Sequence, residues 1–379
     1  MSRVAGPDVF LRNCWYVAAF ANELDADFLA RRILNEPIVL FRASDGTIAA
    51  LADRCPHRLV PLSIGKRLGD TLQCGYHGTI VAADGSCVGI PGQTNIPASS
   101  ATRAFPAVER DALIWIWMGA AELADPALVP DLRWLDHPEW TAATGYVHFD
   151  ADYRLVTDNL LDLSHETYIH QASIGNRVEE TIAKFRATVT IENGRVFCRR
   201  EMPDIEPPPM FAATCEMGDR IDRLQIASYA PPGLNMTEAG FRTAGRADDF
   251  TLYLRIMHLL TPETERSTHY FFTSSRNYRI DDAALTELIR TGTVHTFGED
   301  KFVLELQQQA LAEHVDQTVP RMTIGLDAGP IQGRRLLAAA LAREHADPTA
   351  VAHALPLVEN LNRPGTQGAK ATTAAVGGS

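Results

Sequence analysis

The sequence predicts an α+β protein: an N-terminal antiparallel β domain, followed by a larger α+β domain in which helices flank an antiparallel sheet. Two observations lead to this fold class. Residues 13–118 alternate apolar and polar side chains in short runs separated by turn signals, which is typical of small antiparallel β domains. Residues 187–272 contain further strand-like runs, and helical periodicity lies before them at 152–170 and after them at 281–313.

We place the first domain at residues 1–120. Its clearest strand-like runs are 38–42, 47–51 and 112–118, and its turn signals are Ser44-Asp-Gly and Asp84-Gly-Ser. The stretch that follows, residues 120–138, is rich in Asp, Pro and Ala. This composition predicts a linker to the second domain.

We place the second domain at residues 121–361. Its strand-like runs include 188–191, 252–256 and 269–272. The helix predicted at 281–313 opens with acidic residues and then repeats apolar residues at helical spacing. From Asn362 onward, Gly, Ala and Thr dominate without hydrophobic anchors, so residues 362–379 are expected to form a disordered tail.

The composition of the chain narrows its class. Of its 379 residues, 46% are hydrophobic and 22% are charged, and the net charge is -12. An acidic chain of this kind lacks the clustered basic residues that a nucleic-acid partner requires. There is no secretory signal and no apolar run of about eighteen residues, so we expect a cytoplasmic protein that does not bind a membrane. Six Cys in such a protein indicate metal binding more readily than disulfides.

The first motif is Cys55-Pro-His57 followed, after sixteen residues, by Cys74-Gly-Tyr-His77. Two thiolates and two imidazoles on a mostly β segment are the ligands of a Rieske [2Fe–2S] cluster. Zinc also uses two Cys and two His, but its motifs usually group the two Cys in one knuckle and the two His in another. Here each loop supplies one Cys and one His, which favours a cluster with two irons.

The second motif lies in residues 158–170. Asn159, Asp162 and His165 follow one another at three-residue steps, so we expect them to share one helix face. His165 and His170 would lie about 140° apart on an ideal helix. To bind one ion, the helix must therefore distort between them, as a π-bulge would, or end near His170.

Two His and one carboxylate form the facial triad of a non-haem Fe(II) oxygenase, which leaves positions open for O2. The spacing leaves the choice of carboxylate open. The candidates include Asp162, Glu166, Glu299 and Asp300.

Together the two motifs resemble the oxygenase component of Rieske non-haem iron oxygenases. Within that family the chain is most similar to the vanillate and dicamba O-demethylase group. The similarity runs from residue 13 to about residue 343. It includes Asn13-Cys-Trp-Tyr-Val-Ala, Leu260-Thr-Pro-Glu-Thr-Glu and Glu299-Asp-Lys.

The resemblance implies roles for single residues. Asp300 would be the third iron ligand, and Asn159 would lie near the open side of the iron. The carboxylate of Asp162 would form a hydrogen bond with His165 and, across a subunit boundary, another with His77 of a neighbouring chain. Such a contact requires a homo-oligomer, and the family's head-to-tail rings are commonly trimers.

The resemblance also implies a reaction. A flavin and iron–sulfur reductase would pass electrons from NADH to the cluster, and the iron would use them with O2. A methoxybenzoate such as vanillate would be hydroxylated on its methyl group and would release formaldehyde. The alternative is a Rieske monooxygenase or dioxygenase that hydroxylates a methyl, N-methyl or ring carbon of another aromatic substrate.

The small aromatic acid is expected to contact Asn235 and His258. These residues fall where the dicamba-demethylating member of the group has substrate-contacting Asn and His. The segment 290–293 lacks the Trp that this member has there, which favours vanillate or a related methoxybenzoate. Other classes make distinct predictions: an electron carrier would hold no second iron site, and a structural zinc protein would be colourless.

Overall fold

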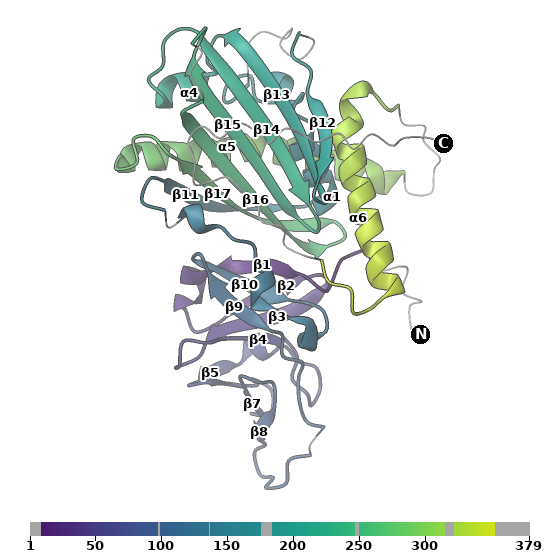
Figure 1. Ribbon diagram of the computed structural model, residues 1–379. Helices are drawn as coiled ribbons and strands as arrows, with labels where there is room; N and C mark the ends of the chain where they lie inside the picture. Colours follow the sequence, from purple (N-terminus) through teal and green to yellow (C-terminus); the bar gives the residue numbers. More distant parts are fainter. Residues whose placement is uncertain are drawn as a thin grey trace.

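The computed structural model describes residues 9–97, 99–135, 137–175, 184–246, 250–314 and 322–352. A small β domain and a larger sheet covered by helices are visible in Figure 1, which confirms the predicted fold class. The predicted tail at 362–379, and the last residues assigned to the second domain, lie outside the described residues. None of the described helices combines the length and the apolar character needed to span a bilayer.

Within the described residues, the small domain contains three antiparallel sheets. The first has the order β1-β10-β9, with β1 (Trp15–Phe20), β9 (Ala107–Arg110) and β10 (Leu113–Trp117). The second has β2 (Leu29–Ile33), β3 (Glu36–Arg42) and β4 (Ile48–Ala52), and the third has β5 (Lys66–Leu68), β6 (Thr71–Gln73), β7 (Ile80–Ala82) and β8 (Cys87–Gly89). The short helices η1 (Ala21–Asp25) and η2 (Leu62–Ile64) connect them. The predicted runs at 38–42, 47–51 and 112–118 coincide with β3, β4 and β10.

The stretch predicted to be a linker is packed against the rest of the protein. It contains the short helices η3 (Ala121–Leu123), η4 (Pro126–Leu128) and η5 (Arg133–Leu135). Its apolar side chains at Val129, Leu132 and Trp134 are buried in one cluster with the tryptophans of β1 and β10. The composition did not indicate this packing, because the apolar residues are interspersed with Asp and Pro.

One antiparallel sheet dominates the large domain. Its order among the described residues is β11-β17-β16-β15-β14-β13-β12. The strands are β11 (Thr141–Phe149), β12 (Thr188–Glu192), β13 (Arg195–Ile205), β14 (Ile221–Ala230), β15 (Leu234–Thr243), β16 (Leu252–Thr264) and β17 (Ser267–Arg276). The predicted strand-like runs all fall within these strands. Consecutive pairing places Asn235 of β15 opposite His258 of β16.

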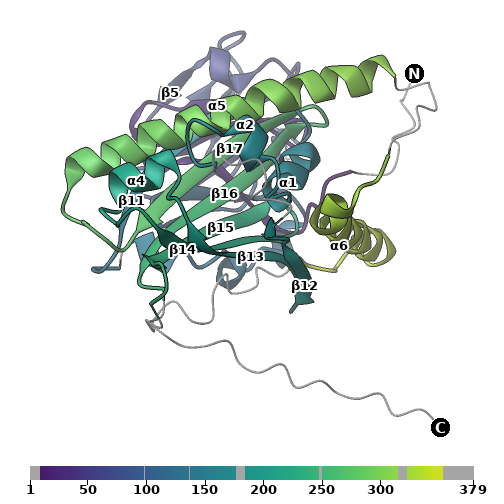
Figure 2. The same ribbon diagram turned by 90° about the horizontal axis from the view of Figure 1, so that it is seen from above.

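Helices lie along one face and one edge of this sheet. They are α1 (Tyr153–Leu161), α2 (Glu166–Ile169), α4 (Pro209–Thr214), α5 (Ala283–Glu313) and α6 (Ala328–Ala346), with η6 (Gly325–Asp327) before α6. Figure 2 shows α5 lying across the sheet with α1 and α2 beside it. The helix predicted at 281–313 is confirmed, and Asp282 caps it by accepting a hydrogen bond from the Leu285 amide, 2.9 Å away.

The helix expected at 152–170 is interrupted, and the expected shared face does not form. α1 ends at Leu161, Asp162 takes an extended conformation, and α2 begins only at Glu166. The cause is local: the Asp162 carboxylate accepts hydrogen bonds from the Ser164 amide and hydroxyl, and such side-chain bonds compete with the helix. Asn159, Asp162 and His165 therefore do not share one helix face.

The two faces of the large sheet have different partners. Met257, Leu259 and Phe271 pack in the apolar cluster that contains the tryptophans of the small domain. Tyr270 and Phe272 point to the other face, where their rings contact Phe297 of α5. The space between this second face and the helices is where the second predicted motif lies.

Candidate metal centres and active site

The two loops of the first motif have the same backbone hydrogen bonds. In each loop, the amide of the Cys donates to the carbonyl five residues later, at 2.8 Å for both Cys55 and Cys74. The amide four residues later donates back to the Cys carbonyl, at 2.9 and 3.1 Å. This repeated geometry holds the two loops as a matched pair around one location.

The side chains of the two loops form two layers. Cys55 and Cys74 are buried, whereas the rings of His57 and His77 are exposed, with centroids 4.8 Å apart. Burial raises the pKa of the Cys55 thiol, the His57 amide partly lowers it, and the neighbouring Cys74 thiol raises it further. Two buried thiols below two exposed imidazoles fit a cluster with one iron on sulfur and the other on nitrogen.

The second motif brings two histidines and one distant carboxylate together. Nε2 of His165 and of His170 lie 3.6 and 3.1 Å from Oδ1 of Asp300. The ligand atoms of the three side chains all lie within 4.8 Å of one another. His165 and His170 flank the short helix α2, and Asp300 projects from α5. Two imidazoles and one carboxylate converging in this way fit a mononuclear non-haem iron.

The broken helix explains how two histidines five residues apart reach the same point. His165 precedes the single turn of α2 and His170 ends it. The expectation that the helix would end near His170 is thus confirmed, and an interruption before His165 replaces the alternative of a π-bulge. Asn159, at the end of α1, donates from Nδ2 to Oδ1 of Asp300 at 3.1 Å.

Asp162 differs from what the resemblance implied. His165 Nδ1 contacts the main-chain carbonyl of Asp162, whereas the Asp162 carboxylate accepts hydrogen bonds at Oδ1 from the amide and the hydroxyl of Ser164. The expected bond between the Asp162 side chain and His165 is therefore corrected to a main-chain bond. The turn after α1 causes this, since it points the carbonyl rather than the carboxylate at the imidazole.

Glu166 and Glu299, two of the carboxylates that spacing left open, face away from the ligand atoms. Glu299 Oε2 lies 2.8 Å from Nδ1 of His170, on the side of the ring opposite Asp300. Glu166 is buried and pairs with Arg223 at 3.3 Å and with Gln225. Burial would raise the pKa of Glu166, but the Arg223 and Arg200 guanidiniums outweigh it and hold the pKa below its usual value. The sequence alone held no signal for these arginine partners.

The predicted substrate contacts line the sheet face that α5 covers. Asn235 and His258 are buried, and Nδ2 of Asn235 lies 3.5 Å from Oγ1 of Thr157. His258 forms hydrogen bonds at Nδ1 with the Tyr270 hydroxyl and at Nε2 with Thr237 Oγ1, which is 2.9 Å away. Burial lowers the pKa of His258 to about 3, so its imidazole is neutral.

One face of α5 lies against both the predicted substrate contacts and the iron ligands. Phe297 packs 5.6 Å from the His258 ring. Asp300 follows Phe297 by three residues on α5, and that spacing places both side chains on the same side of a helix.

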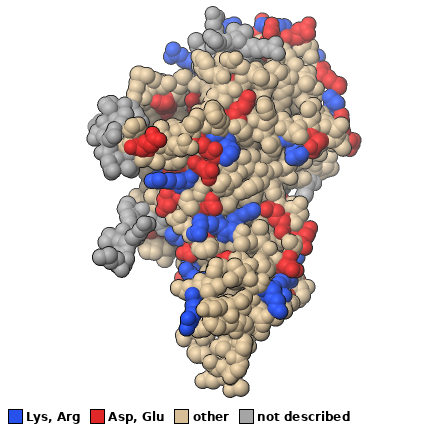
Figure 3. All heavy atoms as spheres, turned by 180° about the vertical axis from the view of Figure 1, so that it is seen from behind, with Lys and Arg blue, Asp and Glu red and all other residues tan. Residues whose placement is uncertain are grey.

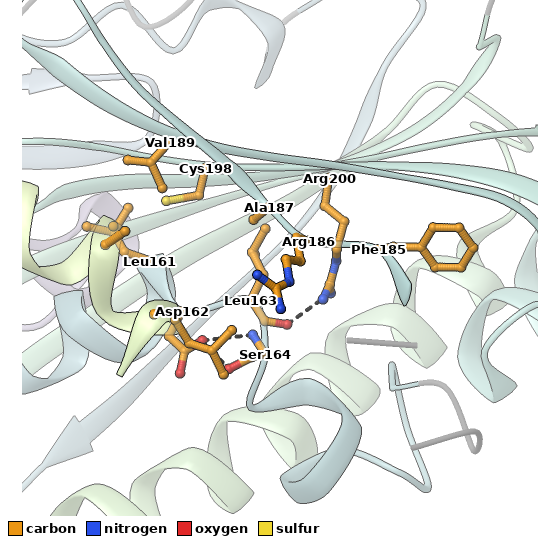
Figure 4. Close-up of a pocket in the computed structure, with 14 residues that line it drawn as sticks. Leu161, Asp162, Leu163, Ser164, Phe185, Arg186, Ala187, Val189, Cys198 and Arg200 are labelled. Carbon is orange, nitrogen blue, oxygen red and sulfur yellow. Dashed lines mark hydrogen bonds between the residues drawn. The ribbon is translucent and has the colours of Figure 1, made fainter. Parts of the chain in front are cut away.

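A cavity of about 360 Å3 lies behind the turn that follows α1 (Figure 4). Asp162, Leu163 and Ser164 form one wall, and Arg200 donates to the Leu163 carbonyl at 2.9 Å. The lining also includes the exposed side chain of Arg186. The cavity therefore leads from the surface to the turn that carries Asp162.

Fold and site define the class of this protein as an oxygenase component with a Rieske domain and a second, mononuclear iron site. Comparison with known proteins agrees. The Rieske [2Fe-2S] domain family matches residues 14–105, and the vanillate O-demethylase oxygenase C-terminal domain family matches residues 149–343. The chain belongs to the vanillate O-demethylase group of Rieske non-haem iron oxygenases, whose cofactors are a Rieske cluster and a mononuclear iron, with O2 as co-substrate and NADH acting through a separate reductase.

Three relatives illustrate the range of the group. The iron-sulfur subunit of the toluene-4-sulfonate monooxygenase system of Comamonas testosteroni is 38% identical over 87% of this chain and 96% of its own. The vanillate O-demethylase oxygenase subunit of a Pseudomonas species is 37% identical over 89% and 96%. The crystal structure of dicamba monooxygenase bound to 3,6-dichlorosalicylic acid superimposes with a TM-score of 0.83 at 34% identity, covering 89% of this chain and 99% of that chain.

Proposed function

We propose that this chain is the oxygenase component of an aromatic O-demethylase that acts on a methoxybenzoate such as vanillate. O2 and an electron pair from NADH, delivered through a flavin and iron–sulfur reductase, hydroxylate the methyl carbon. The hemiacetal then collapses to a phenol and formaldehyde, and water is the other product. The observation that carries the proposal is that the polar pair Asn235 and His258 faces the helix that supplies Asp300.

The metal ligands belong to the same proposal. They are His165, His170 and Asp300 for the mononuclear iron, and Cys55, His57, Cys74 and His77 for the cluster. When bound, these groups supply electron transfer and O2 activation. The protein fixes the iron ligands from separate elements, orients Asp300 through Asn159, and holds the aromatic substrate beside them. The convergence of the three ligand atoms supports the iron site.

Substrate binding would depend on hydrogen bonds rather than on a buried cation. His258 is neutral because burial lowers its pKa to about 3. Oδ1 of Asn235 is buried and has no hydrogen-bond partner among the described residues. It can accept a hydrogen bond from a substrate hydroxyl beside the methoxy group, as in vanillate, and a buried acceptor gains most from such a partner.

A second candidate is hydroxylation of a methyl group carried directly by an aromatic ring. The relative from the toluene-4-sulfonate system, at 38% identity, supports it. An iron held by the same ligands would supply the oxidation of either kind of methyl C–H bond, so the choice between the two reactions lies with the groups that hold the ring.

We infer a head-to-tail homo-oligomer, a trimer, in which His77 of one chain reaches Asp162 of the next. The cavity beside Asp162 reaches the surface, which supports the entry of a side chain from a neighbouring chain. The apolar side chains of Leu59, Ile64 and Tyr76 near the cluster are 69%, 64% and 56% exposed, and exposed apolar groups mark interaction sites. Figure 3 shows few charged side chains on the lowest part of the small domain.

The proposal also includes the domain boundary and the location of the protein. A division at residue 120 is supported by the two family matches, because the first ends at residue 105 and the second begins at residue 149. A cytoplasmic location is proposed because NADH and its reductase supply the electrons there.

The test combines the purified protein with a surrogate reductase and NADH. Vanillate, other methoxybenzoates and toluene-4-sulfonate are supplied in turn, and O2 uptake, formaldehyde and ring products are measured together. Formaldehyde equal to the NADH consumed with a methoxybenzoate supports demethylation. A benzyl alcohol from toluene-4-sulfonate, without turnover of any methoxybenzoate, would favour the second candidate, and a cis-diol would contradict both.

A further inference from the structure

We propose that Glu299 is a positioning residue that orients His170 and makes it the stronger electron donor of the two histidine ligands. The inference rests on the proposed iron site, but not on the identity of the substrate. It assigns the carboxylate that backs a metal-binding histidine to the residue beside Asp300, whereas the resemblance assigned such a role to Asp162.

The imidazole of His170 lies between two carboxylates. Nε2 is 3.1 Å from Oδ1 of Asp300, and Nδ1 is 2.8 Å from Oε2 of Glu299. Successive helix residues project about 100° apart, so Glu299 and Asp300 reach opposite edges of one ring. If Nε2 binds the metal, Nδ1 carries the proton and donates a hydrogen bond to Glu299. The ring is 1% exposed, so solvent does not compete for that proton.

A second contact fixes Glu299 in place. Oγ of Ser173 donates to the same Oε2 at 3.1 Å, and Ser173 belongs to the turn directly after His170. The other oxygen, Oε1, lies 3.8 Å from Nε2 of the largely exposed His295. Glu299 therefore presents one oxygen to His170 and Ser173 and the other toward the surface.

The two histidine ligands differ in what holds Nδ1. His165 contacts the neutral main-chain carbonyl of Asp162, whereas His170 contacts the carboxylate of Glu299. A carboxylate acceptor polarises the N–H bond more strongly, fixes the tautomer and raises the basicity of the ligating nitrogen. We infer that the bond from His170 is the stronger one, and that Glu299 stabilises the ferric form of the iron relative to the ferrous form.

The geometry argues against Glu299 as a ligand itself. Its Oε2 is already shared by His170 and Ser173 on the Nδ1 side of the ring. The ligand atoms gather on the Nε2 side, around Oδ1 of Asp300.

The test uses the full-length enzyme with its cluster in place. In Glu299→Gln the side chain can still accept the hydrogen bond but carries no charge, whereas Glu299→Ala removes both. The Fe(II) dissociation constant is expected to rise about tenfold in the first variant and up to about 100-fold in the second, the usual cost of losing such a partner. Ser173→Ala, which keeps Glu299 but frees it to move, should produce a smaller rise.

A redox titration followed through the EPR signal of the ferric mononuclear iron provides a readout that a purely structural defect would not move. The midpoint potential of the mononuclear iron should rise in Glu299→Gln, while the visible spectrum of the Rieske cluster stays unchanged. Glu287→Gln is the matched control, because Glu287 lies on the same helix and pairs with Arg290 at the surface. It should match the wild type in both measurements.

Two results would overturn the inference. If Glu299→Gln has the affinity and potential of the control, the contact with His170 does not tune the iron. If Glu299→Gln loses iron as completely as Asp300→Ala, Glu299 is a ligand rather than a positioning residue. Retention of iron by Asp300→Ala would instead contradict the proposed iron site, so the two failures are distinguishable.

Discussion

The side-chain amide of Asn159 donates a hydrogen bond to Oδ1 of Asp300, 3.1 Å away. Asn159 lies in the last turn of α1 and Asp300 lies within α5, so this contact joins the two helices where the histidines converge. The same oxygen lies closest to Nε2 of His165 and of His170. Asn159 therefore selects which oxygen of Asp300 faces the two histidines.

Replacing this amide should weaken iron binding. In Asn159→Ala, Asp300 is free to rotate, and we expect the Fe(II) affinity to fall about tenfold or more. Iron per chain after dialysis measures the effect, with Asn95→Ala in an exposed loop as the control. Equal iron retention in the two variants would show that Asn159 does not orient the ligand.

Asp162→Asn should slow electron delivery without displacing the iron. The amide oxygen of Asn can still accept the bonds from Ser164 that shape the turn, so the fold of the site is retained. Loss of the charge should slow reoxidation of a reduced cluster, in a single turnover with O2 and substrate, about tenfold or more. Asp150→Asn, at an exposed position, serves as control, and a rate equal to that of the control would remove Asp162 from the path.

The sequence was most informative where ligands are close together in the chain. The proposed cluster ligands Cys55, His57, Cys74 and His77 could be selected from spacing because each loop is a complete local unit. The proposed iron carboxylate could not, since Asp300 reaches the histidines only when α5 crosses the sheet. Resemblance suggested Asp300, but spacing left several acids equivalent.

The structure separates those acids by their partners, which no local pattern encodes. Glu166 faces Arg223, Glu299 faces Nδ1 of His170, and the Asp162 side chain faces Ser164. The interruption of the helix after Leu161 had a readable cause, because Asp and Ser commonly bond to nearby backbone instead of continuing a helix. Helical periodicity alone gave the wrong result there.

Glu166→Gln should destabilise the whole domain. The change leaves Arg223 and Arg200 buried beside a neutral side chain, and breaking a buried ion pair in this way costs about 3–5 kcal/mol. Urea unfolding measures the free energy of unfolding. Glu192→Gln, which breaks the more exposed pair with Arg199, should cost less than about 1 kcal/mol. Equal losses in the two variants would contradict a structural role for the buried pair.

The protonation of His269 should make the protein less stable as the pH is lowered. This ring donates from Nε2 to the Arg32 carbonyl and accepts at Nδ1 from the Tyr146 hydroxyl, both at 2.8 Å. Burial lowers its pKa to about 4, whereas the unfolded value is about 6.5. Between these values only the unfolded state takes up the proton, so the free energy of unfolding should fall by up to about 1.4 kcal/mol per pH unit as the pH drops.

Urea unfolding of His269→Gln over the same pH range tests this. The variant should be less stable near neutral pH, because its hydrogen bonds are altered, but its stability should depend less steeply on pH than that of the wild type. Identical slopes would exclude His269 as the titrating group.

The central claim, that His165, His170 and Asp300 hold a mononuclear iron apart from the Rieske cluster, is tested most directly by iron analysis of the wild type and Asp300→Ala. The wild type should contain about three iron atoms per chain, two in the cluster and one at this site. Asp300→Ala should contain about two and keep the visible spectrum of the cluster unchanged. A wild type with only two, or a variant that keeps the third, would contradict the account.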